Sequence, residues 1–164
     1  GKTTKYIITT LVVILIIFGG YYLIIKPIKE FKPFTSSPVH WHANFQVSIC
    51  GGNQDITKGY DFEKNALGSN ILHSHDDNVI HIEGQVAKIE DITLGNFFDN
   101  MRIPFSSTQI MDKQNGDLCL NNQLGNVKMF VNGEPNNKFR DFTFSSCDSP
   151  DIKNNCDKIE IKFE

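Results

Sequence analysis

The sequence lacks the short motifs that mark the common enzyme classes. It contains no phosphate-binding glycine loop and no G-x-S-x-G nucleophile elbow, which argues against P-loop enzymes and against serine hydrolases of that kind. Its four cysteines form no C-x-x-C pair and none stands beside a histidine, which argues against a zinc–thiolate site. No internal repeat or low-complexity tract occurs either. The 164 residues therefore leave room for one domain of ordinary size plus a further segment.

Charge is absent from a long stretch near the N-terminus. No charged residue lies between Lys5 and Lys26. The 20 residues between them would span about 30 Å as a helix, the thickness of a bilayer's hydrocarbon core. A cleavable signal peptide is the alternative, but the stretch is long for one and no A-x-A-like site or lipobox cysteine follows it. We therefore predict a retained transmembrane anchor over residues 1–26.

Positive charge is scarce in the rest of the chain. The sequence has 16 Lys and Arg and 19 Asp and Glu, and residues 1–32 hold five of the lysines and one glutamate. Residues 33–164 thus carry 11 positive and 18 negative side chains, a formal charge of −7. An acidic surface repels phosphate backbones, so we expect no nucleic-acid partner, whereas it attracts cations weakly.

The four cysteines all follow the apolar stretch, at Cys50, Cys119, Cys147 and Cys156. An even number of this kind suits two disulfides in an oxidising compartment, so we place the domain outside the cytoplasm, on a single-pass anchor in the cell membrane. Lysines flank both ends of the apolar stretch and give no clear orientation of their own. Cys147 and Cys156 would close a short loop, which leaves Cys50 and Cys119 by elimination. Because four cysteines allow three pairings, this connectivity is a hypothesis.

Behind the anchor, residues 27–38 predict a spacer, because their prolines disfavour a continuing helix. Residues 39–164 form the predicted domain. Short strand-like runs occur at 39–49, 79–83, 86–89, 127–131 and 158–163. Thr93 can cap a helix over residues 94–101. The predicted fold class is α+β: a small, mainly antiparallel β domain with one packed helix, preceded by a single transmembrane helix.

All five histidines lie between residues 40 and 81, as two H-x-H pairs and one single residue. On a strand, residues i and i+2 point to the same face about 6.5–7 Å apart, so each pair presents two imidazoles to one ion. Imidazole suits zinc, copper, iron and nickel. Folding does not require this grouping, so the sequence predicts a metal site. Its expected ligands are His40, His42, His73 and His75, with His81 as a fifth ligand or as a hydrogen-bond partner next to the ligands.

Carboxylates accompany these histidines. Asp76 and Asp77 directly follow the second pair, and Glu83 lies two residues after His81. Each is a candidate ligand, hydrogen-bond partner of an imidazole, or general base. Alternatively, the two aspartates simply form a turn, which needs no metal. We expect Trp41, between the first two histidines, to pack into the core on the opposite face.

The ligand types limit which metals the site is expected to bind, and two functions are consistent with such a site. Histidine nitrogens without a nearby thiolate or thioether favour Cu(II) or zinc over Cu(I), and copper heads the divalent affinity order, so copper is expected and zinc comes next. One hypothesis is a binding module that stores or delivers the metal, as an accessory subunit of a larger membrane complex such as a copper-dependent oxidase or monooxygenase. The other is a metalloenzyme in which three histidines hold the ion and a water fills an open position. The missing catalytic signatures favour the binding module.

Six segments carry a family resemblance: HWHANFQVSICG, LHSHDDNVIHIEG, TLGNFFDNM, GDLCLN, KMFVNGEPN and DKIEIKFE. In this order they resemble a family of prokaryotic secreted or membrane-anchored proteins for which we know of no established activity. The resemblance runs from residue 40 to the C-terminus. It implies an extracytoplasmic domain whose five histidines gather in one site, and it implies a Cys50–Cys119 pair.

Overall fold

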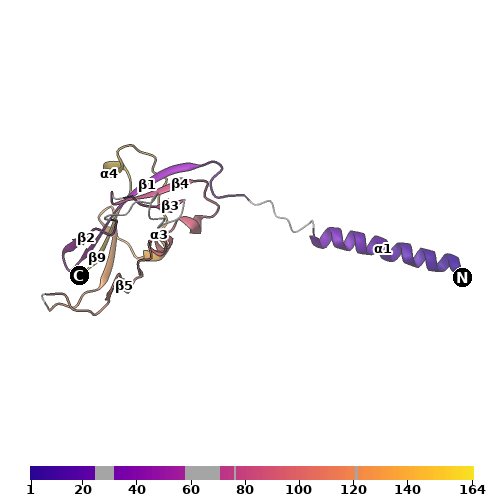
Figure 1. The fold of residues 1–164 in the computed structure, drawn as a ribbon, viewed down its shortest axis with the longest axis horizontal. Coiled ribbons are helices and arrows are strands. Elements are labelled where there is room, and N and C mark those ends of the chain that lie inside the picture. Colours follow the sequence, from indigo (N-terminus) through magenta and orange to yellow (C-terminus); the bar gives the residue numbers. More distant parts are fainter. Residues whose placement is uncertain (25–31, 58–70, 76, 121) are drawn as a thin grey trace. The chain divides into compact units, whose positions relative to one another are not determined.

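The computed structural model describes residues 1–24, 32–57, 71–75, 77–120 and 122–164. The chain divides into two units, residues 1–32 and residues 33–164. In Figure 1 the described residues of the first unit form a helix over residues 2–24, and the second unit consists of strands with short helices. The first predicted boundary, at residue 26, and residues 27–31 of the predicted spacer lie outside the described residues.

The N-terminal unit is helix α1 (Lys2–Ile24). By length and composition it can cross a membrane, although a signal sequence near an N-terminus would have the same properties. Two threonine hydroxyls in its middle are satisfied within the helix, since Thr9 and Thr10 donate to the carbonyls of Lys5 and Tyr6 at 2.9 Å. Such internal bonding leaves an apolar outer surface, as hydrocarbon surroundings require.

The second unit is built on a seven-stranded sheet in the order β3-β4-β1-β9-β7-β8, with β2 also paired to β1. Its strands are β1 (Val39–Ile49), β2 (Gly52–Gln54), β3 (Leu72–His73), β4 (Val79–Gly84), β7 (Val127–Val131), β8 (Glu134–Pro135) and β9 (Lys158–Phe163). Strands β5 (Gln109–Ile110) and β6 (Lys113–Gln114) form a separate pair. All these pairings are antiparallel except that of β1 with β9. The prediction of an α+β, mainly antiparallel domain is confirmed.

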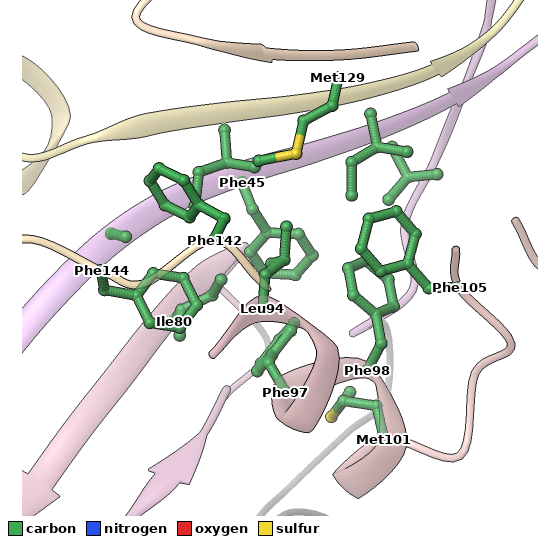
Figure 2. Close-up of a cluster of buried hydrophobic side chains, with 14 of the residues drawn as sticks. Phe45, Ile80, Leu94, Phe97, Phe98, Met101, Phe105, Met129, Phe142 and Phe144 are labelled. Carbon is green, nitrogen blue, oxygen red and sulfur yellow. The ribbon is translucent and has the colours of Figure 1, made fainter. Parts of the chain in front are cut away.

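Alternation along β1 gives the sheet one apolar face. Ala43, Phe45 and Val47 are buried, while the residues between them point to the opposite face. The apolar face packs against helix α3 (Leu94–Asn100), from which Phe97 rises towards Phe45 with 5.1 Å between the ring centroids (Figure 2). The opposite face of β1 carries the histidines.

Helix α3 begins as predicted, because the Thr93 hydroxyl accepts a hydrogen bond from the backbone N–H of Asn96 at 3.3 Å. It ends at Asn100, with Met101 as its C-cap, one residue earlier than predicted. The remaining helical turns are short. Within the described residues they are η1 (Ile89–Ile92), η2 (Phe139–Asp141) and α4 (Ile152–Asn155).

The strand predicted at residues 86–89 is wrong. Val86 is fully buried, but its backbone N–H donates to the Thr35 hydroxyl at 3.0 Å and its carbonyl accepts from the Thr35 N–H at 3.1 Å. The Phe34 N–H likewise donates to the Ala87 carbonyl at 3.0 Å. Val86 is apolar because it is buried, whereas Lys88 and Ile89 are exposed. The bonded residues 34–35 belong to the second unit, although the sequence placed them in the spacer.

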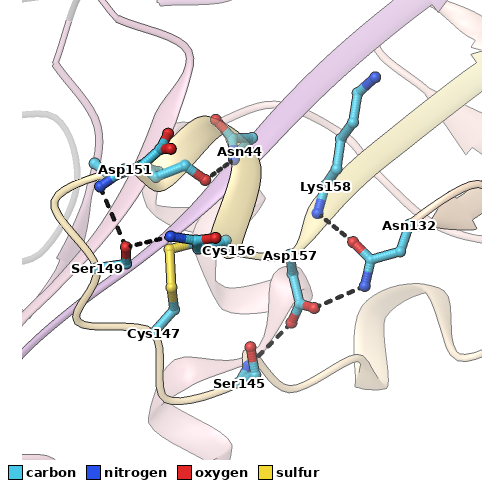
Figure 3. Close-up of a disulfide and its surroundings, with 11 residues drawn as sticks. Asn44, Asn132, Ser145, Cys147, Ser149, Asp151, Cys156, Asp157 and Lys158 are labelled. Carbon is cyan, nitrogen blue, oxygen red and sulfur yellow. Dashed lines mark hydrogen bonds between the residues drawn. A yellow bond between two sulfur atoms is a disulfide. The ribbon is translucent and has the colours of Figure 1, made fainter.

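Two disulfides join Cys50 to Cys119 and Cys147 to Cys156, the two pairs hypothesised above. The second closes the loop before β9 (Figure 3). Asp157 stabilises that loop by accepting from the Asn132 side chain at 3.0 Å and from the Ser145 N–H at 3.3 Å. The loop thereby holds the Cys147 carbonyl beside β1, where it accepts the N–H of His42 at 2.8 Å.

Candidate metal centre

Strand register brings the histidines together. In the β1–β4 pair, His40 lies opposite Glu83 and His42 lies opposite His81. In the β4–β3 pair, His81 lies opposite His73. Residues directly opposite each other share a face of the sheet, so His42, His81 and His73 form one row across three neighbouring strands. The residues next to His81 and His73 in the chain, Ile80, Ile82 and Leu72, point to the apolar face and are fully buried.

Two members of this row, His42 and His81, converge with the neighbouring opposite pair, His40 and Glu83. These four side chains lie closely enough together to hold a metal ion. Each offers one ligand atom, and these atoms all lie within 4.8 Å of one another. Ligands of a tetrahedral ion with bonds of about 2.0–2.1 Å lie roughly 3.4 Å apart, so small side-chain movements suffice to close the set. His42 and His81 are buried, whereas the side chains of His40 and Glu83 are 60% and 41% exposed. One side of the centre is therefore open to solvent.

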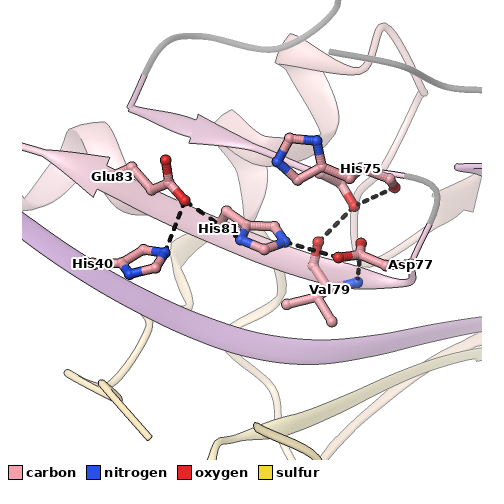
Figure 4. A network of polar contacts seen from close by, with 7 residues as sticks. His40, His75, Asp77, Val79, His81 and Glu83 are labelled. Atoms are coloured by element: carbon pink, nitrogen blue, oxygen red, sulfur yellow. Dashed lines mark hydrogen bonds and ion pairs between the residues drawn. The ribbon is translucent and has the colours of Figure 1, made fainter. Parts of the chain in front are cut away.

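One hydrogen bond, to Asp77, orients the ring of His81. Its Nε2 lies 2.9 Å from the Asp77 carboxylate, and its Nδ1 lies 3.7 Å from the Glu83 carboxylate (Figure 4). Because an ionised carboxylate only accepts, a neutral His81 must carry its proton on Nε2 and donate it to Asp77. The lone pair then sits on Nδ1, facing Glu83. Such carboxylate–imidazole contacts are the usual means of fixing the orientation of a metal-binding histidine.

Two ring nitrogens of the centre are unsatisfied. Within the described part of the chain, Nδ1 of His42 and Nδ1 of His81 are buried without a hydrogen-bond partner. Most buried polar atoms in native proteins are paired, so each exception calls for an explanation. An ion bound by these nitrogens would supply one, since a metal takes the lone pair that no donor reaches.

The electrostatics favour the ligand-competent protonation states. Burial, followed by the nearby His81 and His40, lowers the pKa of His42, and the opposing charges of Glu83 and Asp148 do not cancel this effect. Burial by itself would raise the pKa of Asp77, but its hydrogen bonds from His81 and from the Val79 N–H outweigh burial, so the net shift is downward. A neutral imidazole and an ionised carboxylate are the forms that bind metal.

The second H-x-H pair lies against the same ring. His73 stacks parallel to His81, with 5.6 Å between ring centroids, and His75 approaches His81 edge-on at 4.8 Å. Between them Ser74 is fully buried and donates to the Val79 carbonyl at 2.5 Å, which turns the chain at the end of β3. Asp76 lies outside the described residues.

The structure thus gathers all five predicted histidines, but the compact ligand set contains three of them together with Glu83. Trp41 packs against the core on the other face, though only partly buried. Sequence reasoning missed Asp148 and the Cys147 carbonyl as neighbours of His42. Both lie in a loop that follows His42 by 105 or more residues in the sequence. A contact between such distant residues cannot be predicted from a local sequence pattern.

Comparison with known proteins gives no match: no family model, no curated protein and no solved structure is significantly similar to this chain. The family resemblance of the six segments therefore stays a prediction. The geometry of the centre and the two units of the chain are the basis for a function.

Proposed function

We propose that this chain is a membrane-anchored, extracytoplasmic metal-binding protein that holds copper. The observation that carries the proposal is the convergence of three imidazoles and one carboxylate within 4.8 Å on one face of the sheet. Helix α1 supports the anchor, and the two disulfides support an oxidising compartment. In this role the domain stores or delivers its metal beside the membrane.

The ligand types support copper over other metals, with zinc as the next choice. Three histidine nitrogens and a carboxylate oxygen form a borderline-to-hard set that suits Cu(II) and zinc, and copper binds more tightly than zinc to a given set of this kind. No cysteine is left to compete, because all four are in disulfides. Delivery to a larger membrane complex, such as a copper-dependent oxidase or monooxygenase, is the partner role that we propose.

A metalloenzyme is the second candidate, and the exposure of the centre favours it. The side chains of His40 and Glu83 are partly open to solvent, so a substrate or water could reach an ion held by the buried pair. Three protein ligands with water in the fourth position is the usual arrangement of a catalytic zinc site. In that case Glu83 would act as general base beside the ion.

The test is the metal content of the full chain, purified in detergent from membranes without added metal. We expect about one or more equivalents of copper by elemental analysis and a Cu(II) resonance with nitrogen couplings. Glu83→Gln keeps the shape of the side chain but removes its charge, so copper affinity should fall by at least about 10–100-fold. Glu134→Gln, an exposed carboxylate on β8, is the matched control and should leave affinity unchanged.

The outcomes separate the candidates. Copper without turnover of simple ester, peptide or phosphate substrates supports the binding protein. Stoichiometric zinc with an exchangeable water would move the assignment to the metalloenzyme. Protein that holds no metal after copper and zinc are offered in turn would refute both.

A further inference from the structure

The number of candidate ligands exceeds what one ion takes. Four imidazoles and the carboxylates of Asp77 and Glu83 surround the ring of His81, in contact with it or through a neighbouring ring. A structural zinc or copper ion is bound by about four protein ligands. The set described above leaves His73, His75 and Asp77 unused, although all three lie against His81.

The two sides of His81 are similar in geometry. On one side, His42 lies 4.9 Å from the His81 centroid and 4.5 Å from that of His40. On the other side, His75 lies 4.8 Å from His81 and 5.1 Å from His73. Imidazoles bound to one tetrahedral ion have centroids roughly 5 Å apart, and the centroids of both groups, including His73 at 5.6 Å from His81, are near this spacing. Among the described residues only the first group already has its ligand atoms within 4.8 Å of one another, so the side chains of the second group must turn to close around an ion.

Each side also has its own carboxylate. The Nδ1 of His81 faces Glu83 and its Nε2 faces Asp77. The His81–Asp77 distance of 2.9 Å equals that between His40 and Glu83, two members of the first ligand set. Asp77 is near His75 as well, whose charge helps to lower the pKa of that carboxyl.

We propose that His73, His75 and Asp77 form a second metal site that shares His81 with the first, so that the domain holds two divalent ions bridged by one imidazolate. The inference rests on the proposed metal-binding function and extends it. The first ion takes Nδ1 of His81 with His40, His42 and Glu83. The second takes Nε2 with His73, His75 and Asp77.

At Nε2 of His81 a proton is replaced by the second metal ion. When the second ion binds, the proton between His81 and Asp77 leaves to solvent, and Nε2 and the Asp77 oxygen each donate an electron pair to the metal. No electron is transferred. The imidazolate and the two carboxylates supply three negative charges against the four positive charges of the ions. With bonds of about 2.0–2.1 Å on either side of one ring, the ions lie roughly 6 Å apart.

The experiment is a Cu(II) titration of the full chain in detergent, after its metal is removed with a chelator. We expect two equivalents to remain after desalting. Two Cu(II) ions bridged by an imidazolate couple antiferromagnetically, so the integrated low-temperature EPR signal should fall well below that of the copper bound. His73→Gln/His75→Gln should retain one equivalent with a full signal, and Glu134→Gln should behave as the unaltered protein.

Retention of only one equivalent by the unaltered protein would overturn the second site and leave the proposed function intact, whereas retention of none would overturn both. Two equivalents with a full, uncoupled signal would place the second ion elsewhere and also reject the bridge. So would two equivalents in His73→Gln/His75→Gln. The stoichiometry and coupling of the unaltered protein decide the matter even if a variant fails to fold, which near-UV circular dichroism would reveal.

Discussion

Burial determines how His42 responds to acid. Its pKa lies below the ordinary value of 6.5, mainly because burial penalises the charged ring. The unfolded chain therefore binds more protons than the folded one as pH falls below about 6.5. The stability that neutral His42 contributes is thus complete above that pH and is lost as pH falls through its folded pKa.

This difference can be measured without metal. In the presence of a chelator, the free energy of unfolding in urea should decrease between pH 7.5 and pH 5.5. His42→Gln removes the titrating ring, so its stability should change less over the same range. An equal slope in both proteins would contradict the shift. Asp77 does not interfere, because its pKa lies below the ordinary value of 3.8 and its contribution is lost only in stronger acid.

The metal should leave the loaded protein in acid for the same reason. Protonated imidazole cannot donate to an ion, so binding must weaken as pH falls below about 6. Dialysis against buffers of falling pH, followed by elemental analysis, measures this loss. Copper retained at about pH 4 would argue against histidine ligands.

At the residue scale, the sequence identified the histidines well, since five in one segment is a pattern that neither packing nor surface solvation explains. The parity of β1 follows from alternation and places His40 and His42 on one face, whereas the register that sets His42 opposite His81 was not predicted. Which of the histidines and carboxylates belong to the compact ligand set could not be predicted. Which carboxylate faces which nitrogen of His81 depends on a turn at residues 77–79, where the N–H of Val79 donates to Asp77.

The elements of the domain show where alternation suffices and where it fails. β1, β7 and β9 have the predicted bounds. In β1 and β9 apolar and polar residues alternate over six or more positions, which is a clear signal, whereas β7 ends in a short apolar run at 129–131. β3, β5, β6 and β8 are two residues long and carry no periodic signal at all. The parallel pairing of β1 with β9 joins residues more than a hundred positions apart, and local sequence contains nothing that specifies it.

Close packing at Gly125 provides a test of the sheet. A Cβ at this position would lie 2.3 Å from the ring of Phe163, which is fully buried in β9. Gly125→Ala should therefore lower the free energy of unfolding by about 1–3 kcal/mol, as overpacked cores do. Gly52→Ala is the control, since its nearest atom would be 3.4 Å away. Denaturant unfolding of both variants at one pH measures the difference.

The disulfide between Cys147 and Cys156 should support both stability and the site. Closing a loop of this length is worth about 2–3 kcal/mol in the chain-entropy model. Replacing both cysteines with serine should cost about that much, and should also weaken metal binding, because the Cys147 carbonyl holds the backbone of His42. Unfolding and copper titration of the double variant test the two effects separately. Unchanged affinity would show that the loop does not position the site.

At the scale of the whole molecule, the fate of helix α1 distinguishes an anchor from a signal sequence. If it is retained, alkaline carbonate should leave the protein in the membrane pellet. Mass spectrometry of that protein should then find peptides from residues 6–25. A protein released by carbonate and lacking these peptides would be a secreted one, and the metal site would then act away from the membrane.

The place of β9 between β1 and β7 has a consequence for biogenesis. The sheet cannot close until residues 158–163 have left the ribosome, because β1 and β7 both pair with β9. In an exported domain, as proposed above, these residues must also cross the membrane first. Contacts so distant along the chain also form slowly. If the domain is exported and binds metal as proposed, we therefore expect the metal to be loaded only after β9 has joined the sheet outside the cytoplasm.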